Sequence, residues 1–150
     1  KLDAQCPEDS LVEELILTAR RYLAETGRHL PIYGELGELY AARRYGIELH
    51  KDPHAQGSDG KIGRHLVEVK TISPLRDSTH VRVKESGNFG YLEIVRIDPG
   101  FQIDAKLIKR DRLGQPKGGY FVTSWEEYQI SDHPGPHPLA DLLAIPPADA

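Results

Sequence analysis

The sequence predicts an α+β fold in which two N-terminal helices precede a mixed β-sheet and a short helical segment lies near the C-terminus. Apolar residues fall at helical spacing within the first 45 residues. From residue 47 onward they occur in short runs rich in β-branched residues, and turns containing glycine or proline separate these runs. Helices followed by a series of strands are typical of an α+β domain.

A chain of 150 residues is long enough to form one domain with a substantial core. We expect residues 1–145 to form this domain and residues 146–150 to be a loose tail. The first helix carries a capping box, Ser10 with Glu13 three positions later, and ends at Gly27. The second helix is expected over residues 32–45, with Gly46 as its C-terminal cap.

Residues 66–72 form the clearest strand, because Val67 and Val69 alternate there with charged residues and Pro74 ends the run. One face of this strand should belong to the core and the other should carry charge. The remaining expected elements are short strands at 47–50, 79–83, 91–97, 101–108 and 120–123, one helical turn at 125–128 and a short helix at 139–145.

Composition limits the possible classes of protein. No apolar run approaches the roughly 18 residues that a membrane span needs, so no membrane association is expected. The single cysteine, Cys6, excludes an internal disulfide and a zinc site built from cysteines. A reducing cytoplasm is therefore the expected location.

Charge is distributed unevenly along the chain, whose net charge is -4. Residues 61–117 carry 12 basic and 7 acidic side chains, whereas residues 118–150 carry 5 acidic side chains and no lysine or arginine. A basic middle segment suits a polyanion such as nucleic acid. Solvated strands explain the same charges equally well, so charge alone does not decide between the two interpretations.

The most informative segment runs from Asp59 to Lys70. If Asp59 pairs with Glu68 across a hairpin, only Gly63 and the residue after it remain as the turn, and a type II′ turn requires glycine at that first position. In this register the two carboxylates share one face, with Cβ atoms about 5 Å apart. Lys70 points the same way. A longer loop through Gly60 is the alternative.

Two carboxylates this close repel each other, and a hard divalent cation relieves that repulsion. Mg²⁺ is typically held by one or two carboxylates while it keeps waters and substrate phosphate oxygens as ligands. Such an ion lowers the pKa of bound water, and Lys70 can orient the attacking hydroxide or stabilise the transition state of phosphodiester cleavage. The structural alternative is that Glu68 and Lys70 form a surface pair and Asp59 is a turn residue.

The segment Asp59…Glu68-Val69-Lys70-Thr71 resembles the signature of the PD-(D/E)xK nuclease superfamily, which has the restriction-endonuclease-like fold. It is most similar to Holliday-junction-resolvase-like members and to a small uncharacterised bacterial branch. The resemblance covers roughly residues 32–73, and Ser58 stands where the motif's proline would be. It implies a restriction-endonuclease-like core and a nuclease that cleaves DNA with Mg²⁺ or Mn²⁺ held by Asp59 and Glu68.

The resemblance also implies a glutamate on the second helix. Gly34-Glu35-Leu36-Gly37-Glu38 fits the family's setting with Glu38 as that residue, a third metal ligand. A helical wheel favours Glu35 instead, because the apolar stripe lies about 80° from Glu35 and about 140° from Glu38. We expect Glu38 to join the site and keep Glu35 as the substitute; either can be solvated helix surface.

Weaker candidates surround this segment. Gln56 can position water or phosphate, although a turn role is equally compatible. Histidines 50, 54 and 65 match no metal-ligand spacing, and histidines 133 and 137 flank prolines. No interleaving of aromatic and basic residues indicates stacking on unpaired bases. Candidate phosphate contacts are Lys61, Arg64, Arg76, Arg82 and Lys84.

Two other classes of function remain open. The chain can be a non-catalytic nucleic-acid-binding module that keeps the fold, or a protein-interaction domain in which the acidic segment 118–150 docks a partner or masks the basic face. As a nuclease, 150 residues leave little room for a separate target-recognition domain. Sequence-specific cleavage would then need a partner, a homodimer, or recognition of DNA structure.

Overall fold

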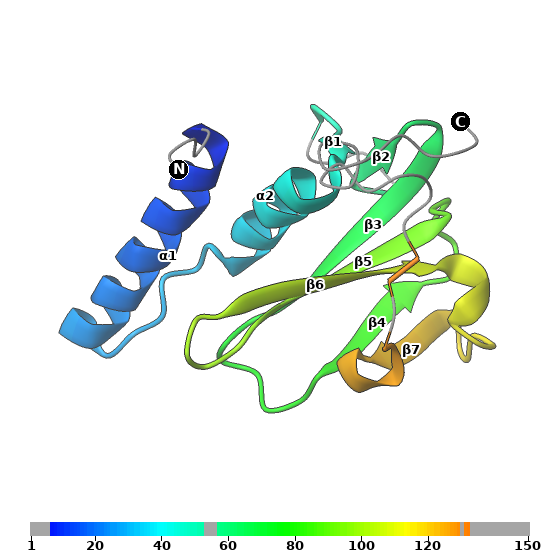
Figure 1. Cartoon of the computed structure of the whole chain (residues 1–150). Coiled ribbons are helices and arrows are strands. Elements are labelled where there is room, and N and C mark those ends of the chain that lie inside the picture. The colour runs from blue at the N-terminus through cyan, green and yellow to red at the C-terminus, as the bar shows by residue number, and fades with distance from the viewer. Residues whose placement is uncertain (1–6, 53–56, 130, 133–150) are drawn as a thin grey trace.

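The computed structural model describes residues 7–52, 57–129 and 131–132. Within these ranges two helices precede a series of strands, which confirms the predicted α+β class (Figure 1). The elements are α1 (Pro7–Thr26), α2 (Tyr33–Tyr45), β1 (Glu48–Leu49), β2 (Gly60–Ile62), β3 (His65–Ile72), β4 (His80–Lys84), β5 (Tyr91–Ile97), β6 (Ile103–Lys109), the 3₁₀ turn η1 (Arg110–Arg112), β7 (Tyr120–Ser124) and the 3₁₀ turn η2 (Trp125–Glu127).

The helix ends agree with the predictions except at the start of α1. Helix α1 begins at Pro7, so Ser10 lies inside the helix and the predicted capping box is wrong. Proline suits a first helical turn, whose N–H groups have no partner within the helix. Gly27 and Gly46 end the two helices with φ of 73° and 72°, a left-handed conformation that glycine adopts without steric cost.

Five strands form a mixed sheet in the order β1-β2-β3-β5-β6, in which β3 and β5 are parallel and the other neighbours are antiparallel. Strands β4 and β7 form a separate antiparallel ribbon. Sequence patterns did not predict this division into two sheets. The strands expected at 47–50 and 101–108 are shorter than expected, and Phe101 has a φ of 66° in the turn before β6.

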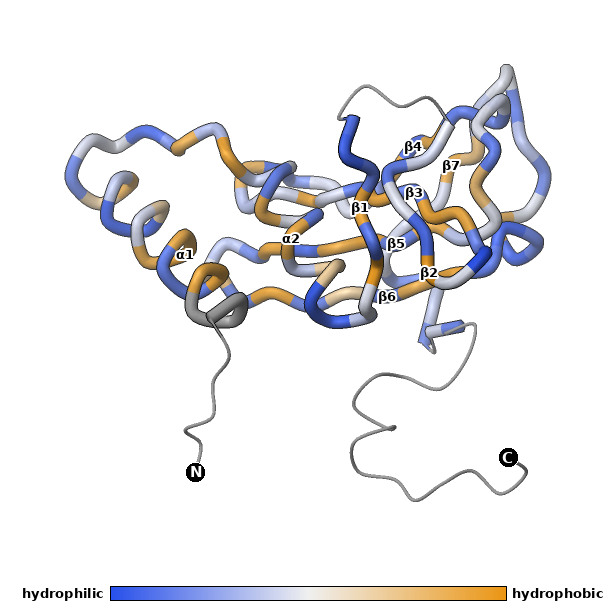
Figure 2. The backbone as a smooth tube through the Cα atoms, turned by 90° about the horizontal axis from the view of Figure 1, so that it is seen from above, coloured by the Kyte–Doolittle hydropathy of each residue, from blue (hydrophilic) through white to orange (hydrophobic). Residues whose placement is uncertain are grey.

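The five-stranded sheet is covered on both faces. Helix α2 packs on Val67, Val69 and Val95, while the β4–β7 ribbon packs on the opposite face through a cluster that includes Ile94 and Phe121. Helix α1 packs beside α2 at the far end of the molecule from the ribbon (Figures 1 and 2). Figure 2 shows hydrophobic residues concentrated along the central strands.

A buried acid lies beneath α2. Glu93 of β5 has no exposed surface, and neither of its carboxylate oxygens has a hydrogen-bond partner among the described residues. The Nε of Arg44 on α2 is also buried without a hydrogen bond there. Burial raises the pKa of Glu93 well above its usual value, because the nearby positive charge of Arg44 compensates only in part for the lost water.

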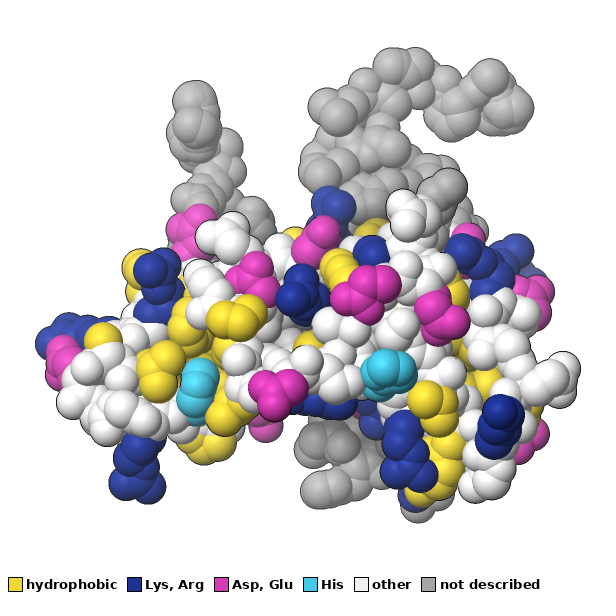
Figure 3. Space-filling model, turned by 90° about the horizontal axis from the view of Figure 1, so that it is seen from below, with side chains coloured by type: hydrophobic (Ala, Val, Ile, Leu, Met, Phe, Trp, Pro, Cys, Tyr) yellow, Lys and Arg dark blue, Asp and Glu magenta, His cyan; other side chains and the backbone are white. Residues whose placement is uncertain are grey.

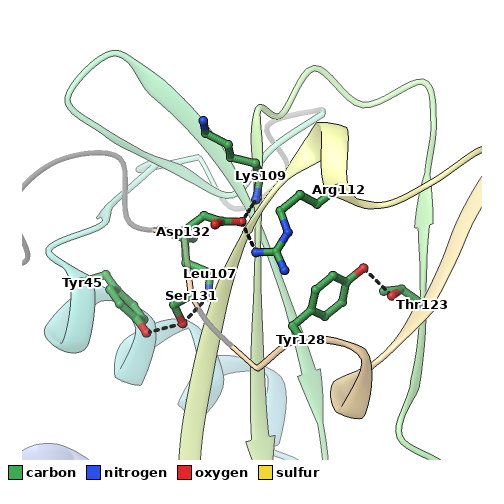
Figure 4. Close-up of polar contacts among 8 residues, drawn as sticks. All are labelled: Tyr45, Leu107, Lys109, Arg112, Thr123, Tyr128, Ser131 and Asp132. Atoms are coloured by element: carbon green, nitrogen blue, oxygen red, sulfur yellow. Dashed lines mark hydrogen bonds and ion pairs between the residues drawn. The ribbon is translucent and has the colours of Figure 1, made fainter.

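Residues 131–132 cover the outer edge of β6 (Figure 4). The Leu107 N–H donates to Ser131 Oγ at 3.2 Å, and the Lys109 N–H donates to Asp132 Oδ2 at 3.1 Å. Arg112 donates to the same carboxylate oxygen at 2.6 Å. These bonds occupy an edge that would otherwise be open to pairing with another strand.

Two further expectations concern the C-terminal residues and membrane-spanning helices. The short helix at 139–145 and the loose tail at 146–150 lie outside the described residues. None of the helices in the described ranges is long and apolar enough to cross a membrane.

Candidate active site

The hairpin that carries the site has the predicted register. Gly60 pairs with Val67 and Ile62 with His65, which leaves two residues in the turn. Gly63 has a φ of 60°, and Arg64 after it does not have a positive φ. This combination is the one that a type II′ turn requires, so the hairpin prediction is confirmed.

Asp59 lies where β2 separates from β3. Its N–H donates to Val67 O at 2.8 Å, and its Oδ2 accepts a hydrogen bond from the Val69 N–H at 2.7 Å. The carboxylate therefore replaces a backbone acceptor just beyond the last paired residue of β2. This bond fixes the Asp59 side chain beside the segment of β3 that contains Glu68.

Glu68 and Lys70 form an ion pair on the face of β3 opposite α2. Lys70 Nζ lies 3.6 Å from Glu68 Oε2, and the side chains are 41% and 19% exposed for Lys70 and Glu68. Desolvation and the negative charge of Asp59 raise the pKa of Glu68, although Lys70 partly offsets this effect. The structure thus brings all three residues of the predicted motif together.

Helix α2 brings a third carboxylate towards this group. Glu38 is half-buried, and burial raises its pKa, with further contributions from the charges of Asp59, Glu35 and Glu68. Glu35 is exposed. The structure therefore favours Glu38 over Glu35. The helical wheel was misleading because it gave no weight to Gly37, which adjoins Glu38 and is buried against Thr71 of β3.

The carboxylates fit a cation that is held by two protein ligands. In the described part of the chain, no three His, Cys, Asp or Glu side chains are close enough to hold one metal ion, so the prediction of Glu38 as a third metal ligand is wrong. Burial raises the pKa of Glu68, and the negative charge of Asp59 raises it further, so a cation bound by both carboxylates would relieve their repulsion. Mg²⁺ is commonly bound through one or two carboxylates with water completing its coordination, so this pair suits Mg²⁺ or Mn²⁺ better than a cage of three carboxylates would.

Glu68 and Lys70 of β3 line a cleft of about 610 Å³ that extends to the exposed face of the β4–β7 ribbon. Arg82, Lys84 and Tyr120 form the ribbon side of this cleft. Its remaining lining comes from Gly57, Val83 and residues 86–89. A negatively charged ligand that enters the cleft therefore meets three cationic side chains beside one carboxylate, which favours binding of a phosphate group.

Two loops at the base of the cleft touch through glycines. The Asn88 N–H donates to Gly57 O at 3.1 Å, and a Cβ on Gly57 would lie 2.6 Å from Asn88 Oδ1. Arg110 holds the second loop from behind by donating to the carbonyl oxygens of Glu85, Gly87 and Phe89 at 2.6–3.0 Å. Ser58, which precedes Asp59, is buried, and its Oγ lies 3.0 Å from His50 Nε2.

The other predicted contacts are distributed more widely. Arg82 and Lys84 line the cleft, whereas Lys61, Arg64 and Arg76 are exposed and are not part of its lining. Gln56 lies outside the described residues, as do histidines 54, 133 and 137. His65 is exposed with its ring against Tyr91, and the described histidines form no metal site.

Sequence reasoning missed Tyr120 and Arg110, because β4, β7 and η1 are far apart in the chain and no local pattern links them to residues 59–70. Comparison with protein-family models and with curated protein sequences finds no match to this chain.

Proposed function

We propose that this chain is a metal-dependent nuclease that hydrolyses phosphodiester bonds in DNA. The observation that carries the proposal is the Glu68–Lys70 ion pair in a cleft that Arg82 and Lys84 also line, with the Asp59 carboxylate held beside β3 by the Val69 N–H. Carboxylates for a cation, a lysine beside them and additional positive charge for the phosphate backbone are the groups that phosphodiester cleavage needs.

Each residue has a separate role in this proposal. Asp59 and Glu68 would hold Mg²⁺ or Mn²⁺, with Glu38 as an outer carboxylate. The bound ion would supply a water of lowered pKa and neutralise charge on the phosphate. Lys70, positioned by its ion pair with Glu68, would donate a hydrogen bond to the attacking water or to a phosphate oxygen. Arg82 and Lys84 would bind the backbone of the substrate.

A cleavage assay tests the proposal. Wild-type protein and the Lys70→Ala variant are incubated with Mn²⁺ and with plasmid, branched and single-stranded DNA. Removal of a charge-stabilising group of this kind lowers rates by roughly 10²–10³-fold. The matched control is Lys109→Ala, which removes an exposed lysine side chain outside the cleft and should leave the rate unchanged. Equal rates for wild type and Lys70→Ala on all three substrates would rule out the proposal.

One observation favours a second candidate, a nucleic-acid-binding module without catalytic activity. Lys70 Nζ lies 3.6 Å from Glu68 Oε2, so the charge of this carboxylate is partly neutralised without a cation. Titration with Mn²⁺ distinguishes the two. A nuclease should bind Mn²⁺, and Asp59→Ala should abolish this binding. A binding module should not need the ion, so its affinity for DNA should be the same with and without Mn²⁺.

A further inference from the structure

The outer face of the β4–β7 ribbon forms a continuous surface with the cleft. Along both strands the inward side chains, such as Val83 and Phe121, are buried in the core. The outward side chains of the ribbon are His80, Arg82, Lys84, Tyr120, Val122 and Ser124, none of which is acidic. Val122, in the middle of this face, is an apolar side chain that is 52% exposed.

A planar pair occupies the cleft end of this face. The register pairs Arg82 with Val122 and Lys84 with Tyr120, so Arg82 and Tyr120 are diagonal neighbours across the two strands. The Arg82 guanidinium carbon lies 3.8 Å from the centre of the Tyr120 ring. Arg82 is exposed and lines the cleft, so the part of its guanidinium that does not face the Tyr120 ring can meet a ligand there.

A flat cation with an accessible face is suited to an unpaired base. Bases that are not paired stack on aromatic rings and on arginine planes, whereas the bases of a duplex are stacked on each other and present only their edges and phosphates. Figure 3 shows lysine and arginine side chains beside hydrophobic side chains over the β4–β7 end of the molecule. This mixture suits a nucleotide, whose base is apolar on its faces and whose phosphate is charged.

We propose that the Arg82–Tyr120 pair and Val122 bind unpaired nucleotides, so that the substrate of the cleft is single-stranded DNA. This inference rests on the proposed nuclease function for the identity of the reacting group. Lys84, two residues from Arg82 on the same face, binds the adjoining phosphate. The strand then continues into the cleft of about 610 Å³, where Glu68 and Lys70 lie.

Fluorescence anisotropy with a labelled oligonucleotide tests the inference. The same sequence is presented as a single strand and as a blunt duplex, in EDTA so that no metal-dependent cleavage occurs. We expect the single strand to bind at least tenfold more tightly than the duplex. Tyr120→Ala removes the ring that positions the Arg82 guanidinium and should weaken binding of the single strand roughly tenfold, about the loss expected for one stacked base, while Tyr120→Phe, which keeps the ring, should bind as wild type does.

Arg82→Lys separates stacking from charge and alters only an exposed side chain, so loss of fold does not complicate its result. The lysine keeps the positive charge but has no planar guanidinium, so this variant should bind the single strand several-fold more weakly than wild type does. Arg20→Lys on α1 is the matched control and should have no effect. Wild-type affinity in Arg82→Lys, equal binding of single strand and duplex, or binding of neither form would overturn the inference.

The two proposals fail in different experiments. Cleavage of duplex DNA that depends on Lys70 and is as fast as cleavage of single strands would leave the nuclease standing and overturn the choice of substrate. Tight binding of single strands that depends on Tyr120, without cleavage of any substrate, would support the nucleotide-binding face and rule out the nuclease.

Discussion

Gly37 is the position at which we expect a single methyl group to disturb both the fold and the site. It lies in the interior of α2, next to Glu38, and faces Thr71 of β3. A Cβ at position 37 would lie 1.9 Å from Thr71 Oγ1 and 3.0 Å from both Cβ and Cγ2 of the same residue. Rotation of the threonine side chain can relieve the first contact, but the contact with its Cβ remains. Helix and strand must therefore separate by a few tenths of an ångström.

The expected energy follows from two opposing effects. Overpacking of a close contact costs about 1–3 kcal/mol. Alanine in place of glycine within a helix contributes about 1 kcal/mol in the favourable direction. Gly34→Ala provides the matched control, because Gly34 is in the same helix and a Cβ added there would meet nothing within 4 Å. The difference in unfolding free energy between the two variants should therefore be about 1–3 kcal/mol, with Gly37→Ala the less stable.

Urea denaturation followed by circular dichroism measures this difference. Combining Gly37→Ala with Thr71→Ala removes Oγ1 and Cγ2 and should recover about 1 kcal/mol of the loss, a coupling that a double-mutant cycle isolates. Under the proposed function, Gly37→Ala should also slow cleavage more than Gly34→Ala does, because displacement of α2 moves Glu38. Equal stabilities for Gly37→Ala and Gly34→Ala, together with no coupling to Thr71, would refute the proposed close contact.

Two further predictions concern buried charge and the loop that lines the cleft. Burial raises the pKa of Glu93 in the folded state, so the folded protein binds this proton more tightly than the unfolded chain does. The free energy of unfolding should therefore fall as pH rises above the pKa of the unfolded chain, about 4.3, by up to about 1.4 kcal/mol per pH unit until the folded-state pKa is reached. Urea denaturation between about pH 5 and pH 8 should show this slope in wild type and not in Glu93→Gln, and parallel profiles would contradict it. Arg110→Met should cost about 2–4 kcal/mol, since it leaves the carbonyl oxygens of residues 85, 87 and 89 without their charged donor. Lys109→Met, a change at an exposed side chain, is its control, and equal denaturation midpoints for the two variants would be evidence against this role of Arg110.

Elements with strong local signals were predicted well. The register of the β2–β3 hairpin follows from one glycine and from the alternation of apolar and charged residues, because a two-residue turn leaves a single way to pair the flanking strands. Gly27 and Gly46 marked the ends of both helices for a similar reason. The start of α1 was missed because a serine three residues before a glutamate has the pattern of a capping box even where it lies inside a helix. That pattern does not determine which of the neighbouring turns is the first turn of the helix, here the one that begins at Pro7.

Contacts between segments that are distant in the chain could not be predicted from local patterns. Glu93 lies in a run that is typical of an ordinary strand, and its complete burial depends on α2, which covers this face, and on β3 and β6, which pair with β5 on either side. The stacking of Arg82 on Tyr120 was missed for the same reason, since 37 positions separate the two residues in the chain while one cross-strand diagonal joins them in the ribbon.

Local patterns in the chain were sufficient for the α+β class, for the hairpin and for a candidate motif at positions 59, 68 and 70, because turns and side-chain alternation depend on residues that are neighbours in sequence. Tertiary packing alone selected Glu38 over Glu35, separated β4 and β7 from the main sheet and formed the cleft. These outcomes depend on which surfaces meet when the apolar faces of the sheet are buried, and contacts between remote segments leave no periodic trace in a single sequence.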